Sequence, residues 1–339
     1  MYNKENTIKA FVWLGKKLSQ LIDESNMQLA KVIDESCKVN YWFTRENIYR
    51  ALHAITTQML DEQKLRNWLA NYGFAEKPKR VGIIMAGNIP LVGFHDLLCV
   101  LVSGNIAVVK ASSKDKYLID FICKLLVGEN SFLRDCIVLT TKPDNIDLLI
   151  ATGSNNSARF FNAEYKNVKS LIRKNRYSVA ILNGNETQTE LEALGDDIFS
   201  YFGLGCRNVS NIFIPKGYNW ESFFKAMEKY SKITAHEGYN DCLRYHKAIF
   251  ELNDDNYITN GFVILKQKQP SFSSISVINH TEYDNIGNVI DFITFNKENI
   301  QCVVGNAVKG GIIFGQTQHP ELNDYADGIN TMQFLLNDI

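Results

Sequence analysis

The clearest pattern in the chain is an alternation of short apolar runs and longer amphipathic segments that begins at residue 80. Residues 80–85, 105–110 and 136–140 are compact apolar runs, which is typical of strands buried on both faces. Between them, residues 94–104 and 115–127 carry apolar side chains at intervals of three and four positions, which predicts helices. The alternation therefore predicts an α/β fold in which helices cover both faces of a parallel sheet.

Residues 1–76 differ from this region because their pattern is helical. Thr44 precedes apolar residues at helical spacing, so its hydroxyl is expected to cap an amphipathic helix. Gly73 suits the position just after a helix end. We expect residues 1–76 to form an N-terminal helical region that caps the main domain.

The second half of the chain continues as a mixture of predicted helices and strands. Its predicted strands are residues 178–182, 210–214, 261–265, 274–278 and 301–304, and the last three are expected to belong to a second sheet. The turn Asn183-Gly184-Asn185 is a natural boundary. We therefore expect one domain over residues 77–183 and another over residues 184–339.

Composition narrows the class of protein. The chain has 339 residues, with 36 Lys and Arg against 37 Asp and Glu, and a net charge of −1 argues against a broad nucleic-acid surface. Its apolar runs are shorter than the ~18 residues of a membrane span, and its start lacks the apolar stretch of a signal peptide. The cysteines number seven, an odd count without Cys-x-x-Cys. This usage predicts a reduced, cytoplasmic protein without a metal site.

One cysteine stands apart from the others. Cys206 lies in Gly203-Leu204-Gly205-Cys206-Arg207, between a predicted helix and a predicted strand. The glycines leave room for a substrate, and Arg207 would favour the thiolate, so Cys206 is either a nucleophile or a cysteine in a turn. Four of the other cysteines fall in predicted buried helices or strands and are expected to be packing residues. They are Cys99, Cys123, Cys136 and Cys302.

Asn88 lies in Ala86-Gly87-Asn88-Ile89-Pro90, a turn that follows a predicted strand and precedes a helix. Ligands bind at that edge of a parallel sheet. The segment is not the Gly-x-Gly-x-x-Gly fingerprint of ordinary dinucleotide sites. The side-chain amide of Asn88 is suited to hold a developing oxyanion, and the alternative role is a helix cap.

Two further turns carry polar groups that suit a cofactor. Lys110, Ser112 and Ser113 end the next predicted strand, where donors would meet a ribose or a phosphate. Gly153 and Ser154 form a turn of small residues before a helical stretch, which suits an anion.

The order of these motifs resembles the aldehyde dehydrogenase superfamily. The residues within these motifs are more similar to those of its acyl-CoA reductase branch, the LuxC-like fatty-acid reductases of bacterial luminescence. The resemblance covers about residues 40–335 and is carried by residues 86–93, 206–210, 314–316 and 324–331.

The resemblance implies an aldehyde-dehydrogenase-like fold, with a Rossmann-like dinucleotide-binding domain over residues 77–183. The catalytic domain would span residues 184–339 and include the C-terminal tail. Cys206 would be the nucleophile and Asn88 the oxyanion donor. Lys110 would contact the adenosine ribose of the cofactor. Ser112, Ser113, Gly153 and Ser154 would line the cofactor site.

Two departures from the superfamily pattern refine these expectations. The place of the glutamate that activates water falls around residues 173–175, which hold no carboxylate. Ser113 replaces the glutamate that often follows the ribose-binding lysine, and a carboxylate there would repel a 2′-phosphate. The first departure argues against hydrolysis, and the second favours NADPH over NADH.

The resulting hypothesis is an NADPH-dependent acyl-CoA reductase that converts a long-chain acyl-CoA to a fatty aldehyde through a thioester on Cys206. One alternative is a hydrolytic aldehyde dehydrogenase that uses Glu186 or Glu237 as its base. Another is a partner-dependent subunit of a fatty-acid reductase complex. The expected partners are an acyl-CoA or acyl-protein thioester, together with a second copy of the chain or an acyl-transferring protein.

Overall fold

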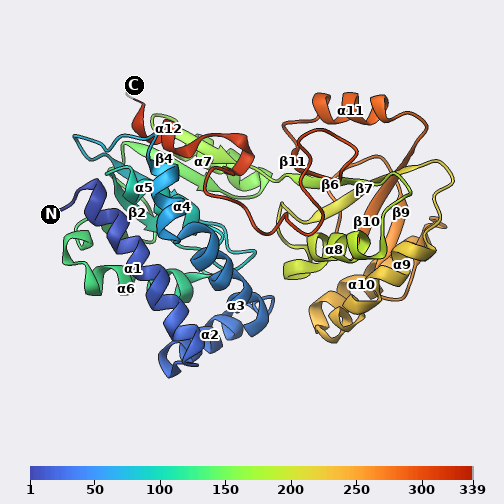
Figure 1. Ribbon diagram of the computed structural model, residues 1–339, viewed down its shortest axis with the longest axis horizontal. Helices are drawn as coiled ribbons and strands as arrows, with labels where there is room; N and C mark the ends of the chain where they lie inside the picture. Colours follow the sequence, from blue (N-terminus) through green and yellow to red (C-terminus); the bar gives the residue numbers. More distant parts are fainter. Residues whose placement is uncertain (338–339) are drawn as a thin grey trace. The chain divides into compact units, whose positions relative to one another are not determined.

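The computed structural model describes residues 1–337, and the chain divides into two compact units (Figure 1). Unit 1 consists of Met1–Asn175 and the residues from Pro320 onward, and unit 2 is Arg176–His319. Each unit is built on its own sheet. None of the described helices is long and apolar enough to cross a membrane.

Unit 1 contains a five-stranded parallel sheet in the order β3-β2-β1-β4-β5. Its strands are β1 (Arg80–Ile84), β2 (Ile106–Lys110), β3 (Ile137–Leu139), β4 (Leu148–Thr152) and β5 (Lys169–Arg173). The strand order reverses between β1 and β4, and that switch point is where doubly wound sheets bind ligands. The predicted strands β1, β2 and β3 are confirmed, whereas β4 and β5 were not predicted.

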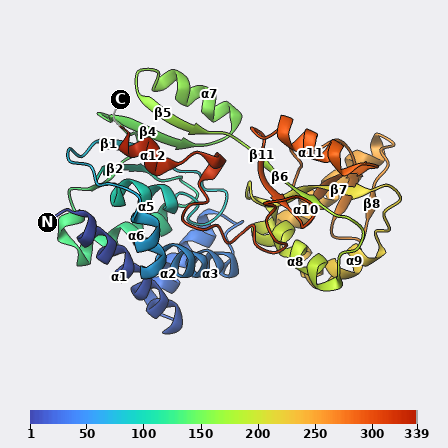
Figure 2. The same ribbon diagram turned by 45° about the horizontal axis from the view of Figure 1, so that its top comes forward.

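Helices cover both faces of this sheet, as the alternating pattern predicted (Figure 2). On one face, α5 (Phe94–Val102) and α6 (Lys116–Glu129) pack with Ile83 and Ile150. On the other face, α7 (Asn155–Glu164) contributes Phe161 to the cluster that contains Leu149 and Ala151. Neighbouring positions of each strand therefore contact opposite layers, as the pleat requires.

The N-terminal helices pack into the core of unit 1. They are α1 (Lys4–Asp23), α2 (Met27–Val39), α3 (Arg45–Ala54) and α4 (Glu62–Leu69). Phe11 and Leu14 of α1 are fully buried in the same cluster as the inner face of α5. The cap at Thr44 is confirmed, because its hydroxyl accepts the Asn47 N–H at 3.2 Å. The apolar pattern after α3 continues as a π-helical segment, Ile55–Met59.

The C-terminal tail belongs to unit 1, although we expected it within the catalytic region 184–339. It contains α12 (Thr331–Leu336), and Leu322, Tyr325 and Met332 are buried in the core of unit 1. The tail is held by polar bonds as well, since the Trp68 indole N–H donates to the Tyr325 hydroxyl at 2.9 Å. Contacts between segments distant in the sequence therefore decide where the tail packs.

A buried ion pair fastens this tail. Arg173, at the end of β5, donates to the Asp96 carboxylate of α5 at 2.6 Å and to the Thr331 hydroxyl at 2.9 Å. All three side chains are buried. Because the pair is buried away from solvent, each charge is compensated only while its partner is present.

Replacing one member of this pair should destabilise unit 1 strongly. Arg173→Met leaves the Asp96 carboxylate buried without its cation, and we expect a loss of about 3–5 kcal/mol in the free energy of unfolding. Urea titration measures the loss. Lys124→Met is the matched control, because the Lys124–Asp120 pair is exposed and should contribute less than about 1 kcal/mol. Equal losses in the two variants would contradict the prediction.

Unit 2 contains a six-stranded sheet in the order β11-β6-β7-β10-β9-β8, parallel except for the β8–β9 pair. Its strands are β6 (Tyr177–Ile181), β7 (Val209–Pro215), β8 (Ile258–Thr259), β9 (Ile264–Gln267), β10 (Val277–Tyr283) and β11 (Ile300–Val304). The predicted second sheet is present. Because β6 pairs with β7 and β11, the boundary between the units lies before β6, whereas we expected it at residue 183.

Two layers of helices enclose this second sheet (Figure 1). α8 (Gln188–Phe199) and α9 (Glu221–Met227) pack on one face with α10 (Glu237–Leu252) nearby, and α11 (Ile286–Phe295) covers the other face. α10 and α11 were not predicted. The segment between α8 and β7 carries Cys206.

Candidate active site

Three turns of unit 1 meet at one edge of its sheet. They follow β1, β2 and β4, which are adjacent and parallel, so their carboxyl ends lie together. We call this the cofactor edge and define it as residues 85–93, 110–115 and 153–154. The Met85 N–H donates to the Lys110 carbonyl at 3.0 Å, which joins the first two turns. Topology therefore assembles the predicted residues of unit 1.

The turn after β1 presents Asn88 on its exposed side. A Cβ atom built on Gly87 would lie 2.5 Å from the Ser112 hydroxyl, so glycine lets this turn lie against the next one. The alternative role of Asn88 as a helix cap is wrong, because α5 begins at Phe94 with Gly93 in the cap position. The structure thus leaves Asn88 in the exposed turn at the cofactor edge.

Asp115 forms hydrogen bonds with both of the first two turns. One oxygen of its carboxylate accepts the Leu91 N–H at 2.7 Å, and Leu91 has a left-handed backbone with φ of 56°. The Asp115 N–H in turn donates to the Ser112 carbonyl at 3.0 Å. Burial raises the pKa of Asp115 to about 8, since only the Leu91 bond opposes the loss of water. In the sequence, Asp115 stands only as the first residue of a predicted helix, and no local pattern indicates this role.

The turn after β4 ends in a helix N-terminus. Ser154 caps α7, and its hydroxyl accepts the Ser157 N–H at 3.2 Å. A Cβ atom on Gly153 would lie 2.7 Å from the Ser157 Cβ, so the turn closes tightly on the helix. Lys110 is half-buried at the end of β2, whereas Ser113 is exposed. The N-terminus of a helix is a favourable place for an anion.

The free energy of unfolding should depend on pH through the ionisation of Asp115. Its pKa in the folded state lies above the ordinary 3.8, so the proton stabilises the fold. That contribution is complete below about pH 4 and is lost as the pH rises to about 8.

Asp115→Asn keeps an acceptor for the Leu91 N–H but cannot ionise. The free energy of unfolding of the wild type should therefore fall relative to this variant between pH 4 and 8, and then level off. Denaturant titration across that range measures the difference. The control is Asp120→Asn, which replaces a half-buried carboxylate of α6 that is paired with Lys124. Parallel curves for wild type and Asp115→Asn would refute the prediction.

Cys206 lies in unit 2 on the segment we call the cysteine loop, residues 200–208. Cys206 is exposed, whereas Cys99, Cys123, Cys136 and Cys302 are buried, so the prediction that those four are packing residues is confirmed. Exposure is the first requirement for a thiol that reacts with a substrate.

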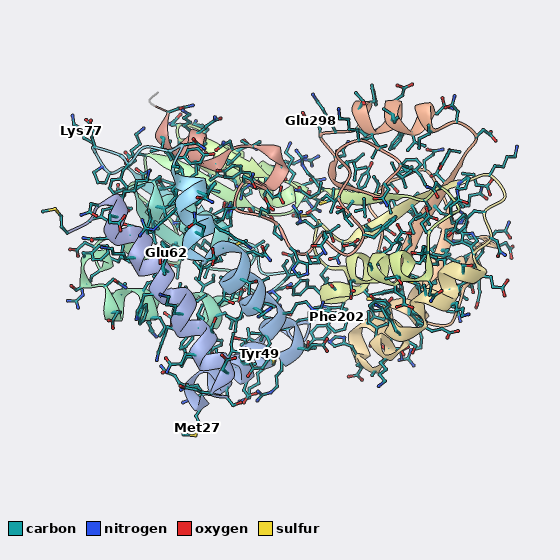
Figure 3. The ribbon with its side chains drawn as sticks, in the orientation of Figure 1. Met27, Tyr49, Glu62, Lys77, Phe202 and Glu298 are labelled. Atoms are coloured by element: carbon teal, nitrogen blue, oxygen red, sulfur yellow. The ribbon has the colours of Figure 1, made fainter. Side chains whose placement is uncertain are left out.

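The backbone of the cysteine loop is strained. Tyr201, Phe202 and Gly203 are consecutive left-handed residues with φ of 52°, 60° and 76°. Such a conformation is unusual for tyrosine and phenylalanine. The Phe202 ring, labelled in Figure 3, packs on His236 at 4.2 Å between ring centres. A turn of this kind persists only where the surrounding structure holds it.

The side chain of Asn208 forms several of the hydrogen bonds that maintain this turn. Its buried amide donates to the Ser200 carbonyl at 2.9 Å and to the Asp197 carbonyl at 3.1 Å, and its oxygen accepts the Gly205 N–H at 2.8 Å. Ser178 of β6 donates to the Cys206 carbonyl at 2.8 Å. These bonds position the backbone on both sides of Cys206. In the sequence, Asn208 stands only within the segment 206–210 and Ser178 only at the start of a predicted strand, because both roles depend on distant carbonyls.

Removing the Asn208 amide should loosen the cysteine loop. Asn208→Ala leaves buried backbone groups without partners, and we expect unfolding to cost about 1–3 kcal/mol less than in the wild type. Alkylation of Cys206 at fixed pH, read by mass spectrometry, should change in rate. The exposed Asn253→Ala change is the control and should alter neither quantity. Unchanged stability in Asn208→Ala would contradict the assignment.

The two carboxylates considered for hydrolysis, Glu186 and Glu237, lie in different settings. Around residues 173–175, where the superfamily resemblance places the hydrolytic glutamate, Arg173 is bound to Asp96. The Glu186 carboxylate accepts the N–H groups of Asn183 and Gly184 and closes its own turn. Glu237 is the exposed first residue of α10. That Cys206 and Asn88 act on one carbonyl remains a prediction.

A family model described as acyl-CoA reductase (LuxC) matches residues 12–228. The chain belongs to the LuxC acyl-CoA reductase family. The match includes the turn of Asn88, the cofactor edge and the cysteine loop, so the resemblance noted in the sequence is confirmed. Membership makes the chain an oxidoreductase that acts on aldehyde or acyl groups. No curated protein matches it.

Solved structures similar to this LuxC-family chain include aldehyde dehydrogenases and a glyceraldehyde-3-phosphate dehydrogenase, GapN. Aldehyde dehydrogenase 21 from Physcomitrella patens, in complex with succinate, is 11% identical with a TM-score of 0.68, over 99% of this chain and 84% of that one. GapN from Methanocaldococcus jannaschii, complexed with NADP, is 13% identical with a TM-score of 0.61, over 85% and 73%. A propionaldehyde dehydrogenase mutant from Clostridium phytofermentans is 9% identical with a TM-score of 0.57, over 89% and 77%. These likenesses establish the aldehyde-dehydrogenase fold.

Proposed function

We propose that this chain reduces an acyl-CoA to the aldehyde, with NADPH as reductant and a thioester on Cys206 as intermediate. The observation that carries the proposal is the exposed thiol of Cys206 on a strained loop braced by Asn208, in a member of the LuxC family. Strain retained around one reactive group is characteristic of functional sites.

The first step exchanges one thioester for another. The Cys206 thiolate attacks the thioester carbon, a carbon–sulfur bond forms, and coenzyme A leaves as its thiolate. The Asn88 amide and the Cys206 backbone N–H would hold the oxyanion, each worth about 3–4 kcal/mol of barrier. The bond that forms and the bond that breaks are of the same kind, so the exchange is nearly balanced.

The second step releases the aldehyde. NADPH, when bound, supplies a hydride to the acyl carbon. The oxyanion of the resulting thiohemiacetal remains with the donors that held the first one. Its collapse breaks the carbon–sulfur bond, so the aldehyde leaves and the Cys206 thiolate is restored. Neither step uses water, which agrees with the engagement of Arg173 and Glu186 in other bonds.

The cofactor edge fits a dinucleotide phosphate. Lys110, Ser112 and Ser113 would meet the adenosine ribose and its phosphate, and Gly153 and Ser154 would border the dinucleotide at the start of α7. The fit rests on the tight packing of Gly87 against Ser112 and on the helix N-terminus at the switch point of the sheet. Exposed Lys114 and Lys116 add positive charge beside Ser113.

Loss of the thiol should abolish the reaction. Cys206→Ala removes the nucleophile, and we expect aldehyde formation from acyl-CoA to fall by roughly 10³-fold or more. The assay follows NADPH oxidation and aldehyde together, with acyl-CoAs of several chain lengths and with an acyl-protein thioester. Cys242→Ala, a half-buried cysteine of the same unit, should stay near wild type. Full activity in Cys206→Ala would end the proposal.

Cofactor preference should depend on position 113. Ser113→Glu brings a carboxylate to the proposed 2′-phosphate site, and we expect the KM for NADPH to rise while that for NADH changes little. Steady-state kinetics with both cofactors measures this. Ser131→Glu, in the short 3₁₀ helix after α6, is a surface control. An unaltered preference in Ser113→Glu would remove Ser113 from the cofactor site.

A further inference from the structure

Asp197 is a fully buried carboxylate that the proposed mechanism does not use. It lies near the end of α8. One of its oxygens accepts the Gly315 N–H at 2.7 Å, and the other accepts the Thr317 N–H at 2.9 Å and the Thr317 hydroxyl at 2.8 Å. A carboxylate that collects three donors from one short segment anchors that segment.

The anchored segment, residues 315–317, is hydrogen-bonded to the cysteine loop. The Thr317 carbonyl accepts the Arg207 Nε–H, and Arg207 directly follows Cys206. The Asp197 carbonyl also accepts the amide of Asn208. Asp197 is therefore connected to both residues that follow Cys206, once through its backbone and once through the 315–317 segment.

The segment approaches α8 closely because of one glycine. Gly315 has φ of 84°, and a Cβ atom there would lie 3.1 Å from the Ala193 Cβ. A larger residue would strain the backbone and push the segment away from α8. This close packing lets the N–H groups of residues 315 and 317 reach one carboxylate.

A fixed guanidinium affects a neighbouring thiol more than a mobile one. Arginine keeps its charge at every working pH, and a cation beside a cysteine favours the thiolate. A side chain free to rotate in water spreads that charge over many positions, where solvent and salt screen it. The Nε bond to the Thr317 carbonyl removes much of this freedom for Arg207.

We propose that Asp197 is a positioning residue, which holds the side chain of Arg207, the next residue in the chain after Cys206, through the 315–317 segment and thereby increases the thiolate fraction of Cys206. The proposal deepens the proposed function and rests on the role of Cys206 as nucleophile. Asp197 itself touches no substrate.

Other charged groups near Asp197 are more solvated. Asp196, the preceding residue of α8, is paired with Lys229 at 3.8 Å, and both side chains are more than 40% exposed. His319 follows the anchored segment and is exposed. Asp196 therefore offers a matched control, because it carries the same charge on the same helix outside the hydrogen-bonded chain.

The experiment is the pH dependence of Cys206 alkylation by iodoacetamide, with the modified peptide quantified by mass spectrometry. Arg207→Gln should move the midpoint of the profile upward by about one pH unit. Asp197→Asn should move it in the same direction, because an amide cannot accept from all three donors. The two changes together should move it no further than Arg207→Gln alone. Asp196→Asn should leave the midpoint in place.

Two milder variants keep the test decisive if Asp197→Asn folds poorly. Thr317→Val removes only the hydroxyl bond to Asp197 and should produce a smaller upward shift. Arg207→Lys restores the charge without Nε and should lie between wild type and Arg207→Gln. A general loosening of the fold would change the alkylation rate without moving the midpoint. Midpoints for folded Asp197→Asn and Thr317→Val that equal the wild type would overturn the proposal.

The outcome is separate from that of the proposed function. Retained aldehyde formation in Cys206→Ala would remove the nucleophile and both proposals with it. An inactive Cys206→Ala, combined with unshifted alkylation midpoints in the Asp197 and Thr317 variants, would overturn only the positioning role.

Discussion

The chemistry proposed for this chain depends on a turn that its backbone does not favour. Tyr201 and Phe202 occupy left-handed conformations just before Cys206, and each such residue costs about 1–3 kcal/mol. The hydrogen bonds of the buried Asn208 amide offset that cost, because they tie the end of α8 to the residue before the cysteine. The strain and its compensation lie within one short loop, so the exposed thiol has a defined place.

The cofactor edge is produced by a different kind of constraint. Parallel pairing of β2, β1 and β4 brings three turns together without unusual side chains. Gly87 then allows two of these turns to touch, and Asp115 ties the Leu91 N–H beneath them. The location of this edge follows from strand order, whereas the location of the thiol follows from individual hydrogen bonds.

Buried polar hydrogen bonds also fix the position of two segments from the C-terminal part of the chain. Arg173 joins β5, α5 and the tail through Asp96 and Thr331, in a core built mostly from apolar side chains. Asp197 has a comparable role in unit 2, where its carboxylate accepts the N–H groups of Gly315 and Thr317. In both cases a charged group with several partners fixes a segment from the end of the sequence onto a helix from its middle.

By itself, the sequence determined β1 to β3 of unit 1 with the helices between them, the presence of a second sheet, the cap at Thr44, and the candidate residues. These features depend on periodicity and on neighbours in the chain, which are local. The motif order also indicated the family to which the chain belongs, as the match over residues 12–228 confirms.

Only the tertiary structure decided that the tail completes unit 1, that β6 belongs to unit 2, and that Asn208, Ser178 and Asp197 surround the cysteine loop. Each of these outcomes depends on bonds to backbone groups far away in the sequence, and every residue type has such groups. Periodicity carries no record of which distant carbonyl or N–H a buried polar side chain will meet, because that partner exists only once the chain has folded.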